Sequence, residues 1–303
     1  MTGHTVGIVG AGAVGQTVAA LLAGESWCRT LLIASRTPAS ARGLVTDLED
    51  ARHLAGGAHA HQATTVDLNE ADAVVICLRA SFTNTATRDV RMAGLAANSP
   101  VIAEWARQLS GYRGTVVMVT NPVDVLARHF AELSGARRVF GIGSATDTAR
   151  YRQALAAHHR VPVDAVDGWV IGEHGDGAVI CVSSTTIGGQ PATVPLDVIR
   201  AELADWPRRI NAGIGRTRHG PAAAVLSALR KLLAQEDGTD VLSVNRAGVW
   251  LGIRLHIQAG VPTVQPLELD AHETSDLLTA RTKLEAAYRK ISHYEQQGVH
   301  ACP

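Results

Sequence analysis

Residues 5–15 read Thr-Val-Gly-Ile-Val-Gly-Ala-Gly-Ala-Val-Gly, and this stretch decides the fold that the chain is expected to adopt. Residues 5–9 have the apolar composition of a strand, and residues 14–23 have that of a helix. Between them lies Gly-x-Gly-x-x-Gly, whose glycines permit a tight turn, a close approach to a pyrophosphate and close helix–strand packing. The predicted dinucleotide-binding residues of this turn are Gly10, Gly12, Ala13, Val14 and Gly15.

Strand and helix candidates continue to alternate as far as residue 142. The expected strands cover residues 5–9, 30–34, 73–78, 115–120 and 138–142, and the expected helices cover residues 14–23, 41–55, 101–109 and 124–134. Strands that alternate with helices predict an α/β fold with a doubly wound parallel sheet, the Rossmann arrangement.

The alternation stops near residue 143. Helices are expected at 146–158 and 273–295, with a long helical region at 196–234 that Pro207 and Pro221 should interrupt. Strands are expected at 165–171, 179–184, 240–244 and 249–257. This mixture predicts a C-terminal α+β catalytic domain. We therefore expect a dinucleotide-binding domain over residues 1–143 and a substrate domain over residues 144–303, packed tightly together.

The composition excludes several classes of protein. Among 303 residues, Lys+Arg and Asp+Glu both total 28, so no basic excess suggests nucleic acid or an anionic membrane surface as a partner. No apolar run has the ~20 residues of a spanning helix, and no leader segment is recognisable, so a cytoplasmic protein is expected. The four cysteines form no CxxC pair, which favours buried free thiols, and no metal site is expected.

The end of the second expected strand bears on the choice of cofactor. NAD-binding proteins usually carry a carboxylate here that bonds the ribose 2′-hydroxyl. This chain has Ser35 and Arg36 instead, and neither would repel a 2′-phosphate. Ser35 can donate a hydrogen bond, and the guanidinium of Arg36 can pair with phosphate oxygens. NADP(H) is therefore favoured as the cofactor, and NAD(H) is possible.

Three further segments place polar residues at the ends of expected strands. They are Thr-Asn-Pro-Val-Asp at 120–124, Gly-Ile-Gly-Ser-Ala-Thr-Asp-Thr-Ala-Arg at 141–150 and Gly-Glu-His-Gly-Asp at 172–176. A carbonyl that takes up a hydride becomes an alkoxide and needs a proton, and histidine suits this task because its pKa lies near neutrality. With these segments in this order, the chain resembles the lactate/malate dehydrogenase family over nearly its whole length.

The resemblance implies hydride transfer between a nicotinamide cofactor and a small 2-hydroxy or 2-oxo acid. His174 would exchange the proton, and Asp147 would orient its ring and stabilise the imidazolium. Arg150 would bind the substrate carboxylate through a planar, bidentate fork. Asn121 would lie near both the nicotinamide and the substrate, and Thr217 would contact the substrate. The family resemblance also implies a homodimer or homotetramer.

The segment after the third main strand departs from the family pattern. The family's loop carries one arginine that polarises the carbonyl, and here two arginines compete for that role. Arg88 keeps the Thr-Arg context of the family, whereas Arg91 keeps the seven-residue interval to Asn98. Near the specificity position stands Phe82, where malate-specific members carry arginine and lactate-specific members carry glutamine. A specialised 2-oxo acid, rather than pyruvate or oxaloacetate, is the expected substrate.

Two other functions stay open at this point. One is the reduction of an imine, or of a 2-oxo acid that carries another acidic group. The other is a catalytically silent nucleotide-binding protein, which the altered loop would suit. The retention of Asp147, Arg150 and His174 together favours catalysis.

Overall fold

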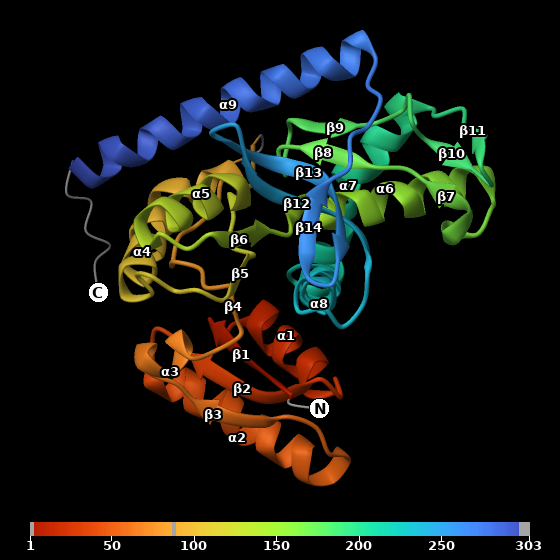
Figure 1. Cartoon of the computed structure of the whole chain (residues 1–303). Helices are drawn as coiled ribbons and strands as arrows, with labels where there is room; N and C mark the ends of the chain where they lie inside the picture. The colour runs from red at the N-terminus through yellow and green to blue at the C-terminus, as the bar shows by residue number, and fades with distance from the viewer. Residues whose placement is uncertain (1–2, 87–88, 297–303) are drawn as a thin grey trace.

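A parallel sheet forms the first part of the fold (Figure 1). The computed structural model describes residues 3–86 and 89–296, with side chains through residue 291. The strands of the parallel sheet are β1 (His4–Val9), β2 (Cys28–Ala34), β3 (His59–Gln62), β4 (Ala73–Ile76), β5 (Thr115–Met118) and β6 (Arg138–Gly141). They lie in the order β3-β2-β1-β4-β5-β6, and each adjacent pair is parallel.

Helices connect these strands and cover the sheet. They are α1 (Ala13–Ala23), α2 (Pro38–Ala55), α3 (Thr65–Asn69), α4 (Leu95–Gln108) and α5 (Val123–Ser134). All four residues of β4 are apolar and buried, as expected of a central parallel strand with helices on both faces. The prediction of a doubly wound α/β fold is therefore confirmed.

The sequence patterns missed β3 for a physical reason. Its residues are His-Ala-His-Gln, and three of the four are exposed at the edge of the sheet. An edge strand with little buried area needs no apolar run. It therefore lacks the pattern by which the inner strands are recognised.

The sheet does not end at β6 but continues as an antiparallel sheet. The added strands are β8 (Val170–Gly172), β9 (Ala178–Ile180), β12 (Gly238–Arg246), β13 (Val249–Gln258) and β14 (Val261–Val264). The order beyond β6 is β12-β13-β8-β9, with β14 also paired to β13. One apolar core runs through both parts of the sheet. The division at residue 143 stays a prediction, because sheet and core both cross it.

The remaining elements lie outside the large sheet. A three-stranded sheet contains β7 (Val166–Asp167), β10 (Thr186–Ile187) and β11 (Gln190–Pro191). The helices of this half are α6 (Gly143–His159), α7 (Leu196–Ile214), α8 (His219–Leu232) and α9 (Ala271–Gln296), with a short 3-10 turn at η2 (Val163–Ala165). A second 3-10 turn, η1 (Met92–Gly94), directly precedes α4 in the first half.

The two prolines of the long helical region behave differently from each other. The expectation that Pro207 interrupts the helix is wrong, because α7 continues through it. The break falls instead at Gly215, whose φ of +78° is the left-handed conformation that commonly ends a helix. Pro221 lies in the first turn of α8, where its missing N–H has no helical partner to lose. Gly215 therefore separates the two helices.

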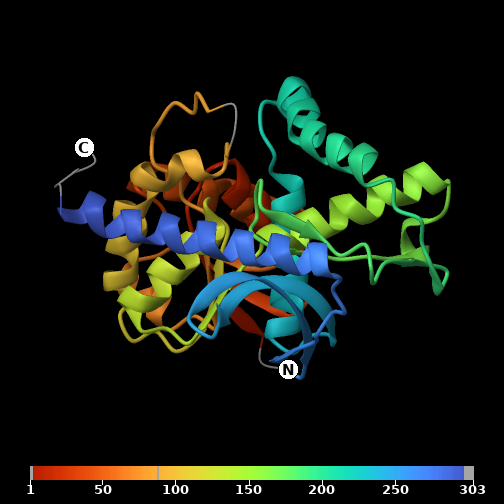
Figure 2. The ribbon, with the colours of Figure 1, turned by 90° about the horizontal axis from the view of Figure 1, so that it is seen from above.

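Helix α9 crosses the molecule and ties its two halves together. Figure 2 shows it running from the antiparallel strands to the helices of the parallel sheet. It packs against β9 and β13 at one side and against α4 and α5 at the other. Among the described residues, no helix, α9 included, is both long and apolar enough to span a membrane.

Three cysteines were expected to be buried free thiols, and the structure describes all of them. Cys28 and Cys181 are buried and Cys77 is partly buried, each as a free thiol. Burial raises the pKa of each thiol to about 12. These thiols are therefore protonated at neutral pH. Cys302 lies outside the described residues.

Candidate active site

The glycine turn between β1 and α1 has room for a ligand on one side only. Gly10 has a φ of +121°, and a Cβ there would lie 2.8 Å from the backbone nitrogen of Leu78. A Cβ at Gly15 would lie 1.8 Å from the carbonyl oxygen of Gly10, so helix and strand touch closely. A Cβ at Gly12 would meet nothing within 4 Å, and no side chain caps the helix at this residue. The free N–H groups of the first turn therefore fit a pyrophosphate.

Ser35 and Arg36 follow β2 beside this turn. The Gly10 N–H donates to the carbonyl oxygen of Ala34, which joins the turn to the end of β2. Ser35 is half-buried and Arg36 is exposed. Within the part of the chain that the structure describes, Arg36 has no hydrogen bond or ion pair, so its guanidinium is available to an anion.

His174 and Asp147 form a buried pair. His174 lies two residues after β8, and Asp147 lies in the second turn of α6. The His174 Nδ1 and the Asp147 Oδ2 are 2.6 Å apart. The two residues are only 9% and 8% exposed, so water screens this contact little. No hydrogen bond to Nε2 of His174 occurs among residues 3–86 and 89–296. The pair thus leaves Nε2 able to exchange a proton with a bound molecule.

The surroundings of the pair shift both pKa values downward. Burial and the nearby charge of Arg91 lower the pKa of His174, and the opposing influence of Asp147 does not offset them. Burial by itself would raise the pKa of Asp147, but His174, Arg91 and Arg150 together hold it below its ordinary value. Asp147 is therefore ionised at neutral pH, and the His174 imidazole releases a proton readily.

Two residues that the sequence patterns did not single out, Asp124 and Gly143, contact the backbone and the ring of His174. The His174 backbone N–H donates to Oδ2 of Asp124 at 2.8 Å. Gly143, the first residue of α6, lies against the ring, and a Cβ there would come within 2.3 Å of His174 Cγ. Any side chain at residue 143 would therefore displace the imidazole. The Asn-Pro-Val-Asp segment that contains Asp124 was recognisable from the sequence as a polar strand end. The contact of Asp124 with His174 was not, because the two residues are 50 positions apart.

Two arginines accompany the pair. The Arg91 Nη2 lies 3.6 Å from Oδ1 of Asp147. Arg150 is 8% exposed and, among the described residues, its guanidinium has no hydrogen bond or ion pair. A buried cation without an anionic partner fits a site that awaits a carboxylate. The competing candidate for the role of Arg91, Arg88, lies outside the described residues.

Asn121, which follows β5, carries a buried amide oxygen. Its Oδ1 is buried without a hydrogen-bond partner in the described part of the chain, which suits an acceptor facing a nicotinamide or a substrate. Its carbonyl oxygen accepts from Nδ2 of Asn98, whose Oδ1 accepts the Ala80 N–H; both distances are 2.8 Å. Asn98, considered from sequence only as a spacing marker, therefore ties the loop after β4 to Asn121.

The other predicted substrate residues lie in less enclosed places. The guanidinium of Arg79 lies 4.3 Å from the centre of the Phe82 ring, and the ring tip would be 3.0 Å from a Cβ on Gly94. Phe82 therefore packs within its own loop, and its contact with a substrate stays a prediction. Thr217 is half-buried between α7 and α8, and its contact with a substrate also stays a prediction.

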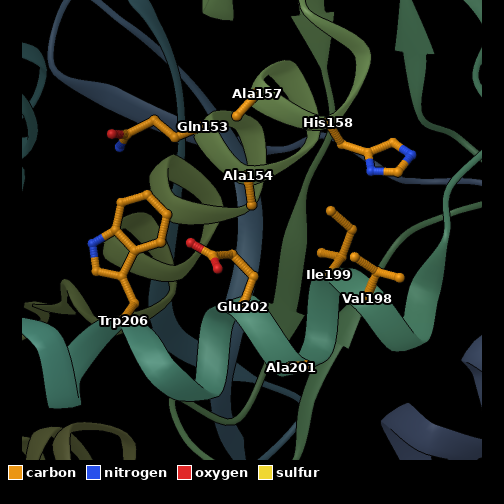
Figure 3. Close-up of a pocket in the computed structure, with 9 residues that line it drawn as sticks. All are labelled: Gln153, Ala154, Ala157, His158, Val198, Ile199, Ala201, Glu202 and Trp206. Carbon is orange, nitrogen blue, oxygen red and sulfur yellow. The ribbon is translucent and has the colours of Figure 1, made fainter.

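An apolar groove of about 700 Å³ lies elsewhere, between α6 and α7 (Figure 3). It is lined by Gln153, Ala154, Ala157, His158, Val198, Ile199, Ala201, Glu202 and Trp206. None of these residues belongs to the group around His174. The groove lies along the later turns of α6, whereas Asp147 lies near the start of that helix.

Comparison with known proteins assigns the chain to a family. Residues 4–141 match the family model described as lactate/malate dehydrogenase, NAD binding domain. The chain is 32% identical over 259 residues to L-lactate dehydrogenase 2 of Lactiplantibacillus plantarum, covering 80% of this chain and 81% of that protein. It is 31% identical over 293 residues to the L-2-hydroxycarboxylate dehydrogenase (NAD(P)(+)) of Methanocaldococcus jannaschii, covering 88% and 93%.

Solved structures share the fold at lower sequence identity. The minor L-lactate dehydrogenase from Enterococcus mundtii gives a TM-score of 0.86 at 23% identity, over 96% of this chain and 99% of that one. The malate dehydrogenase from Plasmodium falciparum gives 0.87 at 19%, with the same coverage. The fold, the glycine turn and these relatives agree: the chain belongs to the lactate/malate dehydrogenase family.

Proposed function

We propose that this protein transfers a hydride between a nicotinamide dinucleotide and a 2-oxo or 2-hydroxy acid. The observation that carries the proposal is the buried His174–Asp147 pair with Arg91 beside it and the unpartnered Arg150 on the same helix as Asp147. When bound, the dinucleotide supplies or accepts the hydride. The carbonyl oxygen of the substrate gains or loses a proton at Nε2 of His174.

Each charged residue has a separate part in this scheme. The Arg150 guanidinium binds the substrate carboxylate, and Arg91 stabilises negative charge on the carbonyl oxygen. Without substrate, the lowered pKa of His174 favours neutral imidazole, the form that accepts a proton when a hydroxy acid is oxidised. A carboxylate held at Arg150 would offset that arginine's charge and so favour the imidazolium that reduction needs.

The substrate is proposed to be a specialised 2-oxo acid. The loop after β4 lacks an arginine or glutamine at the specificity position of the malate and lactate enzymes, and Phe82 stands there with Arg79 against its ring. NADP(H) is the proposed cofactor, supported by the free guanidinium of Arg36 at the end of β2. Assembly as a homodimer or homotetramer stays a prediction from the family.

The proton-transfer role of His174 has a direct test. Purified protein is screened against 2-oxo acids, with and without amines, by the absorbance of NADPH and NADH. At least one 2-oxo acid should be reduced without an amine, and His174→Asn should lower kcat by about 10²- to 10⁴-fold because the proton donor is lost. Cofactor affinity should be nearly unchanged. His158→Asn, which changes an exposed histidine of α6 away from the His174 group, is the control and should retain activity.

Two outcomes of that screen would contradict the proposal. If no 2-oxo acid is turned over without an amine, the proposed reaction does not occur: turnover only with an amine indicates imine reduction, and no turnover at all favours a silent nucleotide-binding protein. If His174→Asn keeps the wild-type kcat, another group carries the proton.

The choice between Arg91 and Arg88 can be made by separate alanine substitutions. Arg91→Ala should lower kcat by about 10²-fold or more, since it removes the guanidinium beside Asp147. Arg88→Ala should change kcat much less. The reverse ranking in steady-state kinetics would transfer the role to Arg88.

The cofactor preference depends on Arg36. Arg36→Ala should lower kcat/KM for NADPH by about 10- to 100-fold, because a charge-assisted hydrogen bond to the 2′-phosphate is lost, and should leave NADH unaffected. Arg42→Ala, an exposed arginine on α2, serves as the matched control. A wild-type preference for NADH, or equal losses with both cofactors, would rule out this role.

The carboxyl behind His174 predicts a pH dependence of stability. Burial raises the pKa of Asp124 to about 7, so the folded protein keeps a proton that the unfolded chain releases near about pH 4. The stabilisation from this proton is present below about pH 4 and is lost as the pH rises toward 7. Asp124→Asn has no carboxyl at this residue that could take up or release a proton. The free energy of unfolding, wild type minus variant, should therefore fall between about pH 5 and pH 8, by at most about 1.4 kcal/mol per pH unit.

Urea unfolding of both proteins across this range measures the difference. A constant difference would show that Asp124 does not titrate within the range.

A further inference from the structure

Asp89, in the loop between β4 and η1, contacts the opposite half of the molecule through both its backbone and its side chain. Its φ of +48° is left-handed, so the chain turns there. Its backbone N–H donates to Oδ2 of Asp176 at 3.0 Å, and its side chain forms an ion pair with Lys283 of α9. Two groups from the substrate half therefore hold a loop that leaves the parallel sheet.

Lys283 has a second anionic partner, which fixes where its ammonium lies. Its Nζ lies 2.9 Å from Oε2 of Glu173, a residue 2% exposed that directly precedes His174. The same Glu173 oxygen accepts the Gly177 N–H at 3.0 Å. A buried carboxylate needs a nearby cation, so Lys283 is held where Asp89 meets it. One ammonium thus joins the loop to the segment that carries His174.

Asp89 also controls the turn that carries Arg91. Its carbonyl oxygen accepts the N–H groups of Met92 at 2.8 Å and Ala93 at 3.3 Å, which closes a helical turn around Arg91. The Val90 carbonyl accepts from Nδ2 of Asn84, which fastens the turn to the earlier part of the loop. A shift at Asp89 would therefore move the Arg91 guanidinium relative to Asp147.

We propose that Asp89 and Lys283 are positioning residues that hold Arg91 at the reaction centre. The ion pair, with the Asp89 N–H bond to Asp176, docks the loop on α9 and on the segment between β8 and β9. The docked turn then sets the Arg91 guanidinium beside Asp147, facing the site where the carbonyl oxygen would lie. The catalytic part of this inference rests on the proposed function, whereas the docking itself does not.

Substitution of Asp89 in two backgrounds tests whether it acts through Arg91. Asp89→Asn keeps the size and the backbone N–H but loses the charge. In the wild-type background it should lower kcat by about 10- to 100-fold, because a misplacement of about 1 Å is costly. In the Arg91→Ala background it should lower kcat no further. An unchanged kcat in the first case, or an equal loss in both, would overturn the proposal.

Lys283→Met and a control on the same helix test the docking without any turnover. Hydrogen exchange of the amides of residues 89–93 should be faster in Lys283→Met than in the wild type. Arg281→Met, which changes an exposed residue of α9, should leave exchange and kcat unchanged. Equal exchange in the two variants would overturn the docking. If the wild type reduces no 2-oxo acid, the proposed function fails, and the exchange result still decides the docking.

The melting temperature distinguishes a loss of loop docking from a loss of overall stability. Lys283→Met also leaves Glu173 without its cation, so its melting temperature should fall. Asp89→Asn keeps the Lys283–Glu173 pair and should melt like the wild type. Faster exchange at residues 89–93 in Asp89→Asn, at an unchanged melting temperature, therefore supports the docking role. Wild-type exchange in this variant would contradict it.

Discussion

The hydrogen bond between Nδ1 of His174 and Oδ2 of Asp147 is the constraint around which the rest of the molecule is arranged. Asp147 lies on the helix that follows β6, and His174 follows β8. In the sheet these two strands are separated by β12 and β13. The bond can form only because the sheet continues from its parallel to its antiparallel part. Gly143 then lets the imidazole lie directly on the start of α6.

Without a ligand, positive charge exceeds negative charge around the His174–Asp147 hydrogen bond. Asp147 contacts His174 and Arg91, and its charge also acts on Arg150, which has no ion pair among the described residues. Burial makes an unbalanced positive charge costly, and an anionic substrate would restore the balance. The same excess explains why the pKa of His174 lies below its ordinary value. An anion bound at Arg150 would therefore raise the pKa of His174.

Long-range contacts hold the loop and the histidine segment in a common frame. Lys283 on α9 meets Asp89 of the loop and Glu173 beside His174, while Asn98 connects Ala80 with Asn121. These contacts explain how a loop that departs from the family pattern still brings an arginine to Asp147. They also give α9 a structural part in the site, through Lys283.

Local patterns were enough to predict the fold class and to choose the histidine and aspartate that the structure brings together. The glycine turn, the apolar strands and the Gly-Glu-His-Gly-Asp segment are each contiguous, and their chemistry can be recognised without knowing what lies opposite. The polar strand β3 and the path of α7 through Pro207 could not be recognised, because an edge strand buries little and helix continuity depends on packing.

What the sequence determined by itself is therefore the dinucleotide turn, the alternation of strands and helices, and the identity of the histidine, aspartate and arginine. The tertiary structure decided the partners: Asp124 and Gly143 behind His174, Arg91 beside Asp147, and Lys283 between Asp89 and Glu173. The physical reason is distance along the chain. Each of these contacts joins residues tens to hundreds of positions apart, and burial makes them strong only after the sheet has brought them together.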